Sequence, residues 1–134
     1  MSRRRFLKTI LGTALLPVAA IANARLQQQS QTLLLQHSPI AGFQYYEGEN
    51  LWPLMHIGDE LMLKREPDNR YDRHAMAVYW NDNKLGYIPR HENRTLAQLF
   101  DHGQKLTAQI RRLQTEAGPW GRVEIAVYLQ VQQA

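Results

Sequence analysis

The sequence predicts a small, mainly β domain (α+β with its helix counted), built as an OB-like barrel of five or six strands with one helix. Three observations support this fold class. The chain has 134 residues, which is enough for one small core. Most of its apolar segments alternate with polar residues and end at turn-forming residues, as half-buried strands do. A single segment has the apolar spacing of a helix.

The first strands lie in the segments "TLLLQHSPIAGFQYYEG" and "GDELMLKREP". We expect the first strand to begin at Thr32, to be interrupted near Ser38-Pro39, and to resume as far as Tyr46, because proline within a strand marks an edge or a bulge. The second segment alternates apolar and polar residues and ends at Pro67.

A β-hairpin follows, with strands over 75–80 and up to Ile88 joined by the turn 81–83, and Pro89 ends it. The helix is predicted over 92–101, with Gly103 placed for a left-handed C-cap. The segments "KLTAQIRRL" and "RVEIAVYLQV" predict two final strands around the turn "TEAGPWG".

Residues 1–24 have the features of a signal peptide: a basic start, an apolar stretch from Ile10 to Ala22, and the small-residue ending Ala22-Asn23-Ala24. "SRRRFLK", from Ser2 to Lys8, matches the twin-arginine pattern. We therefore expect the twin-arginine export machinery to be a partner of the precursor, and the mature protein to be periplasmic. A general secretory leader and an uncleaved membrane anchor are the alternatives.

After the leader, residues 25–31 predict a flexible polar lead-in and residues 32–134 the folded domain. The formal net charge of +4 belongs to the leader, since its removal leaves twelve basic and twelve acidic residues. The absence of cysteine excludes disulfides, thiolate zinc sites and cysteine nucleophiles.

The stretch "REPDNRYDRHAMAVYW", residues 65–80, contains the candidate site. Its Asp68-Asn69 pair predicts a turn, but a turn does not require Tyr71 beside Asp72. Aromatic rings, a carboxylate and an arginine can together stack a base, accept from a sugar hydroxyl and bind a phosphate. The alternative is that the tyrosines lie at the edge of the core and that the charges pair with one another.

Three segments, "GFQYYEG", "LKREPDNRYDRHAMAV" and "KLGYIPR", resemble the HIRAN domain family in their order and spacing, over roughly residues 32–110. This family is found in DNA-repair translocases and as free-standing bacterial proteins. The resemblance implies an OB-like barrel that captures the 3′ end of single-stranded DNA.

The resemblance also implies roles for individual residues. Tyr45 and Tyr71 would stack on the terminal nucleotide, and Asp72 would accept from its 3′-hydroxyl. The remaining implied site residues are Asn69, which shapes the loop, Tyr87, near a phosphate, and Arg90, a basic contact. The chain departs from the family pattern at Gln44, Arg70 and His74, where arginine, proline and asparagine are usual, and the loss of that arginine removes a phosphate contact.

No catalytic arrangement is visible in the sequence, and its five histidines lack metal-ligand spacing. We therefore expect a binding module without enzymatic activity, metal or cofactor. The competing hypothesis is a periplasmic interaction module for a peptide, a glycan or a protein partner. Export away from chromosomal DNA and the neutral mature chain favour that hypothesis.

Overall fold

The computed structural model describes residues 31–132, and these contain six strands. The strands are β1 (Gln31–Pro39), β2 (Glu60–Arg65), β3 (Met76–Trp80), β4 (Asn83–Tyr87), β5 (Lys105–Leu113) and β6 (Val123–Val131). The α-helices are α3 (Gly48–Leu51) and α4 (Arg94–Asp101). Four short 3₁₀ helices connect these elements: η1 (Phe43–Tyr45), η2 (Trp52–Leu54), η3 (Arg90–Glu92) and η4 (Pro119–Gly121).

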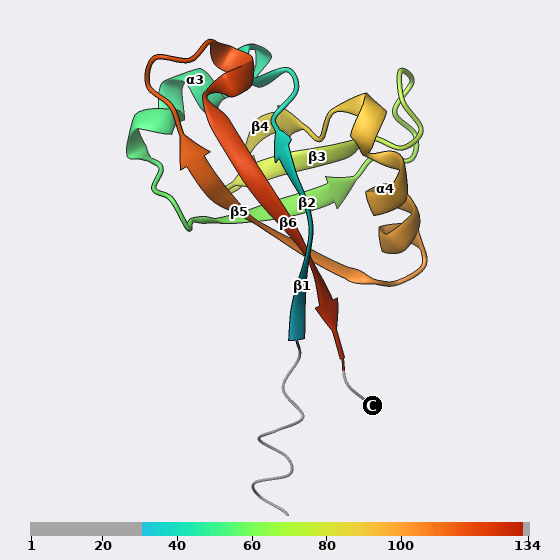
Figure 1. The fold of residues 1–134 in the computed structure, drawn as a ribbon. Coiled ribbons are helices and arrows are strands. Elements are labelled where there is room, and N and C mark those ends of the chain that lie inside the picture. The colour runs from blue at the N-terminus through green and yellow to red at the C-terminus, as the bar shows by residue number, and fades with distance from the viewer. Residues whose placement is uncertain (1–30, 133–134) are drawn as a thin grey trace, which may run out of the picture. The chain divides into compact units, whose positions relative to one another are not determined.

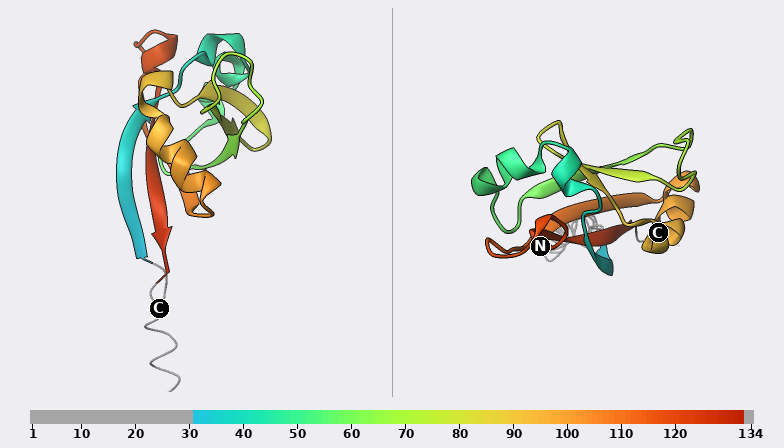
Figure 2. Two further views of the ribbon diagram at one scale, coloured as in Figure 1. Left: turned by 90° about the vertical axis from the view of Figure 1, so that its right-hand side faces the viewer. Right: turned by 90° about the horizontal axis from the view of Figure 1, so that it is seen from above.

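The strands form one antiparallel sheet in the order β1-β6-β5-β2-β3-β4 (Figure 1). β1 and β6 lie side by side in both Figure 1 and the left view of Figure 2. The sheet is not closed into a full barrel. However, the chain beyond β1 reaches the opposite edge strand, where the backbones of Ala41 and Tyr87 exchange hydrogen bonds of 2.8 and 2.9 Å.

Gly86 makes this approach possible. Its φ is +145°, and a Cβ there would lie 2.3 Å from the carbonyl oxygen of Ala41. Any other residue would therefore collide with the backbone that bridges the two sheet edges.

The core follows directly from the alternation of the strands. In β2, Leu61 and Leu63 are buried between exposed neighbours, and β5 buries alternate residues in the same way. The largest side chains that are almost fully buried include Ile40, Phe43, Met76, Leu85, Ile88, Leu96, Ile110, Ile125 and Val127. These residues lie in β3, β4, β5 and β6, in η1, just after β1 and β4, and in α4. One core therefore unites the sheet and the helix.

The predicted hairpin, the strand over residues 105–113 and the mainly β fold are confirmed. The helix begins at Arg94, because η3 occupies the residues before it, and Gly103 has the expected left-handed φ of +84°. The predicted return of the first strand as far as Tyr46 is wrong. The N–H of Tyr45 donates to the carbonyl of Gly42, which forms η1 and places Phe43 in the core.

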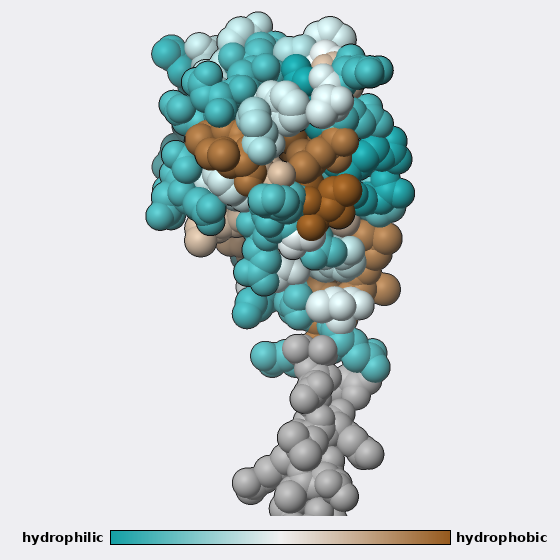
Figure 3. All heavy atoms as spheres, turned by 90° about the vertical axis from the view of Figure 1, so that its left-hand side faces the viewer, coloured by the Kyte–Doolittle hydropathy of each residue, from teal (hydrophilic) through white to brown (hydrophobic). Residues whose placement is uncertain are grey.

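Several large apolar side chains remain exposed: Leu33, Leu34, Leu54, Ile57, Met62 and Trp120. Figure 3 shows a face on which apolar side chains gather among polar ones. Within residues 31–132, no helix is long and apolar enough to cross a membrane. The predicted leader and all of the lead-in except Gln31, which begins β1, lie outside the described residues.

Candidate functional site

The loop between β2 and β3 is organised by its own side chains. The Oδ1 atom of Asn69 accepts from the backbone N–H groups of Tyr71, at 2.9 Å, and Asp72, at 3.1 Å. The Oδ1 atom of Asp72 then accepts from the backbone N–H of His74 at 2.9 Å. Short polar side chains that bond to the backbone just ahead of them fix tight turns, so this loop has one defined conformation.

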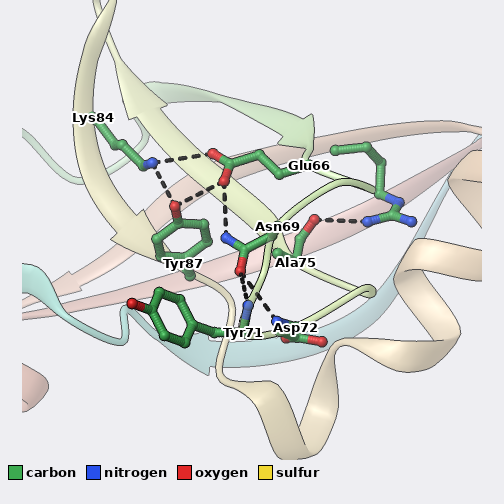
Figure 4. A network of polar contacts seen from close by, with 8 residues as sticks. Glu66, Asn69, Tyr71, Asp72, Ala75, Lys84 and Tyr87 are labelled. Carbon is green, nitrogen blue, oxygen red and sulfur yellow. Dashed lines mark hydrogen bonds and ion pairs between the residues drawn. The ribbon is translucent and has the colours of Figure 1, made fainter.

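One side of the loop is joined to β4 by a polar network around Glu66 (Figure 4). Its carboxylate accepts from Lys84 at 3.0 Å, from the Tyr87 hydroxyl at 2.9 Å and from the Asn69 amide at 3.1 Å. Lys84 also donates to the Tyr87 hydroxyl, and its ammonium group lies 4.9 Å from the centre of the Tyr46 ring. Each charged group here therefore has partners within the protein.

The network shifts the pKa values of its members. Burial alone would raise the pKa of the Glu66 carboxyl, but hydrogen bonds from Asn69, Lys84 and Tyr87 outweigh it and leave that pKa below its usual range. Burial opposes the charge on Lys84, whereas its bonds to Tyr87 and Glu66 raise its pKa overall. Burial and the neighbouring carboxylate raise the pKa of Tyr87 to about 12. At neutral pH the network thus holds one anion and one cation.

The other side of the loop is tied to α4 by Arg65. Its guanidinium pairs with Asp101 at 2.9 Å and also donates to the backbone carbonyls of Ala75, at 2.8 Å, and Arg73, at 3.0 Å. The hydrogen bond from Arg65 keeps the pKa of Asp101 below its usual range. Only 8% of the Arg65 side chain is exposed, so this arginine serves to hold the loop.

A third connection joins the loop to the start of α4. Asn93, which is almost fully buried, donates through Nδ2 to Oδ2 of Asp72 at 2.7 Å. Asn93 precedes the helix but makes no side-chain cap there, since its amide is directed to the loop instead. The three connections hold the loop against both β4 and α4.

The loop and α4 together border an open hollow of about 570 Å³. From the loop it is lined by Asn69, Arg70, Tyr71, Asp72, Arg73 and His74, and from η3 and the first residue of α4 by Arg90, His91 and Arg94. Four arginines and one carboxylate make this lining strongly cationic.

The eight arginines within the described residues divide into two groups. Within residues 31–132, the four that pair with a carboxylate are Arg65, Arg111, Arg112 and Arg122. The other four in that range form no ion pair within 4.0 Å, and all four line the hollow: Arg70, Arg73, Arg90 and Arg94. Within the described residues, the guanidinium groups that lack a carboxylate partner are therefore gathered in one place.

The exposed ring of Tyr71 lies beside these cations, and two further exposed aromatic rings lie on η1 and η4. Tyr71 is 78% exposed, and the guanidinium of Arg70 lies 5.7 Å from the centre of its ring. Tyr45 is equally exposed on η1, which contacts η4, where Trp120 is 70% exposed. Large rings left in water at 70% or more have little packing role, so they are available to a ligand.

The structure brings four of the six predicted site residues to the hollow: Asn69, Tyr71, Asp72 and Arg90. Tyr87 lies instead in the Glu66 network, and Tyr45 is not among the residues that line the hollow. The roles of all six remain predictions.

Sequence reasoning did not select Arg73 and Arg94 for the hollow, or Glu66 and Lys84 for its support. A possible signal was present, since "RYDR" and "RHENR" each place two arginines close together. Within the described part of the chain, no three histidine or carboxylate side chains group as ligands for a metal ion.

The fold and the site together define a class: a small β domain of barrel-like form with a cationic hollow and an exposed aromatic ring beside it. The family model of the HIRAN domain matches residues 34–132, and the chain belongs to this family. Family membership supports a nucleic-acid-binding module in general.

Two solved structures have a similar fold. A protein from Lactobacillus plantarum is 26% identical, with a TM-score of 0.67 over 77% of this chain and 99% of that one. The HIRAN domain of human HLTF is 18% identical, with a TM-score of 0.59 over 76% of this chain and 81% of that one, and it supports the fold. A comparison with curated proteins finds no match.

Proposed function

We propose that this protein captures the 3′ end of single-stranded DNA in the hollow between the β2–β3 loop and α4. The observation that carries the proposal is the gathering of the unpaired arginines, Arg70, Arg73, Arg90 and Arg94, beside the exposed ring of Tyr71. Guanidinium groups bind phosphates in a bidentate manner, and a ring in water can stack on any base.

Asp72 is the candidate acceptor for the terminal hydroxyl. Each of its two carboxylate oxygens already accepts one hydrogen bond, from His74 and from Asn93. Because a carboxylate offers about four lone-pair positions, it can accept another bond from a sugar hydroxyl. Its other two bonds fix its orientation, and the new bond would be charge-assisted.

Oligothymidylates that differ only at the 3′ end test this proposal, with binding followed by fluorescence anisotropy at low salt. We expect a strand with a 3′-hydroxyl to bind more tightly than the same strand with a 3′-phosphate, whose charge would lie beside Asp72. A blunt duplex should bind more weakly than either, because its terminal base is already stacked.

Two results would contradict the proposal at different levels. Equal binding of the hydroxyl and phosphate ends would exclude capture of the hydroxyl and leave general single-strand binding. No binding of any strand would exclude the nucleic-acid role and favour the interaction module, for which the exposed apolar residues offer a surface.

We further propose that the module binds its strand without cleaving it. A labelled oligonucleotide incubated with the protein should keep its length on a denaturing gel. A shorter product that disappears together with binding would show that the site is catalytic.

Export by the twin-arginine route is proposed from "SRRRFLK" alone. Replacing Arg3 and Arg4 together by Lys should hold the precursor in the cytoplasm, as seen by cell fractionation. The single substitution Arg5→Lys changes a basic residue outside the pair and is the matched control, which should be exported as before. Unchanged export of the Arg3, Arg4 variant would indicate a general secretory leader.

A further inference from the structure

Two of the five histidines in the chain line the hollow. His74 comes from the β2–β3 loop and is half-buried, whereas His91 comes from η3 and is largely exposed. The other three, His37, His56 and His102, lie within the described residues but do not line it. The chain therefore offers titratable groups inside the hollow and matched ones outside it.

The charged surroundings of His74 are mixed. From its own loop it has Asp72, which accepts from its backbone N–H, and the unpaired Arg73. From α4 it has Asp101, which is close enough for the charge of His74 to help lower the pKa of that carboxyl. Asp101 is paired with Arg65, so much of its charge is already compensated.

His91 has fewer compensating groups. Its Nε2 atom lies 3.6 Å from Oε2 of Glu92, on the same short helix. Arg90 precedes it, and Arg94 lines the same hollow from α4.

We propose that His74 and His91 make nucleic-acid binding at the hollow pH-dependent, so that binding strengthens as the pH falls from about 8 to about 5.5. The proposal rests on the function proposed above. A phosphate that enters the hollow places negative charge beside the imidazoles and therefore favours their protonation in the complex. Binding is then accompanied by proton uptake.

The size of the effect follows from linkage. A group whose pKa is higher in the complex than in the free protein adds affinity at a pH below both values and adds none above them. Each unit of that difference is worth about tenfold in affinity. With two such imidazoles in the hollow, we expect affinity to rise about 10- to 100-fold across the range.

The experiment uses the full protein and a hydroxyl-ended oligothymidylate, at constant ionic strength and at several pH values from 8 to 5.5. Thymine and internucleotide phosphates do not titrate in this range, so the probe itself contributes no pH dependence. Calorimetry in two buffers of different ionisation enthalpy measures directly how many protons are taken up. Because the slope of log K against pH equals the number of protons taken up, a 10- to 100-fold change over this range corresponds to an average uptake of about 0.4 to 0.8 proton.

Two sets of variants identify the groups. The double variant His74→Gln, His91→Gln should bind with little pH dependence and little proton uptake. The double variant His37→Gln, His56→Gln removes the same number of imidazoles outside the hollow and should keep both. The single variant His91→Gln affects an exposed side chain, so it gives about half of the effect even if the His74 substitution disturbs the loop.

Affinity of the unaltered protein that does not change with pH would overturn this inference and leave the proposed function intact. Persistence of the full pH dependence in both His91→Gln and the hollow double variant would also overturn it. Absence of binding at every pH and at low salt would overturn the proposed function and this inference together.

Discussion

The two sides of the β2–β3 loop differ in how many of their charged groups are paired. On the side of β4, the charged groups Glu66 and Lys84 bond to each other and to Tyr87, so this side is complete without a ligand. On the side of α4, Arg65 is paired with Asp101, but the four arginines that line the hollow have no carboxylate within ion-pair distance. Both sides belong to one loop, which separates a structural network from a surface available to anions.

This difference distinguishes charges that support the site from charges that can bind. Paired groups at the surface contribute modestly to stability and leave little net charge for a ligand. Unpaired guanidinium groups that lie close together repel one another, and a bound anion relieves this repulsion. Substitutions on the first side should therefore change stability, and substitutions on the second side should change binding.

The largest expected effect is on the network. Glu66→Ala removes the acceptor shared by Lys84, Tyr87 and Asn69, and should lower the free energy of unfolding by about 2 kcal/mol, since several partners lose a bond. Urea unfolding measures this change. Glu66→Gln keeps the shape and part of the hydrogen bonding, so it should cost less, and a loss below about 0.5 kcal/mol for Glu66→Ala would contradict the structural role.

Tyr71 tests the binding side. Because its ring is 78% exposed, Tyr71→Ala should leave stability nearly unchanged but weaken oligonucleotide binding by about 1 to 2 kcal/mol, the contribution of one stacked base. Tyr71→Phe keeps the ring and should retain most of the affinity. Equal loss of affinity in both variants would assign the effect to the hydroxyl instead of stacking.

The arginines of the hollow should appear in the salt dependence. On a single strand, the logarithm of the binding constant falls with the logarithm of the salt concentration by about 0.7 for each phosphate contacted. Arg94→Ala should reduce this slope by about 0.7. Arg112→Ala removes the same charge, but Arg112 already pairs with Glu124. The salt slope of this variant should therefore stay unchanged. The same slope in both variants would contradict the division of the arginines.

The smallest expected effect is in the acid range. The pKa of Glu66 is lower in the folded protein than its usual value of 4.5, so its contribution to stability is present above that value and is lost as the pH falls through the folded one. We expect a loss of less than about 1 kcal/mol between pH 5 and pH 3, because the network is partly exposed. Urea midpoints across this range should fall less steeply in Glu66→Gln, and parallel curves would exclude this carboxyl as the cause.

Local sequence patterns determined a large part of the fold. The hairpin of β3 and β4 and the strand β5 were predictable because each combines alternation with turn residues next to it in the chain. The segment after β1 was not, since its apolar residues also suited a strand. Its turn into η1 depends on the burial of Phe43 and on the pairing of Ala41 with Tyr87, which is distant in sequence.

The candidate site, like the fold, was predictable from the sequence only in part. The sequence by itself identified the loop, because Asn69, Tyr71 and Asp72 lie close together and their side chains determine its turns. Only the tertiary structure decided which charges are free. Pairing depends on distance in space, and the bonds that take Arg65 to Asp101 and Asn93 to Asp72 span 36 and 21 residues, so no local pattern could show that Arg73 and Arg94 would share one hollow.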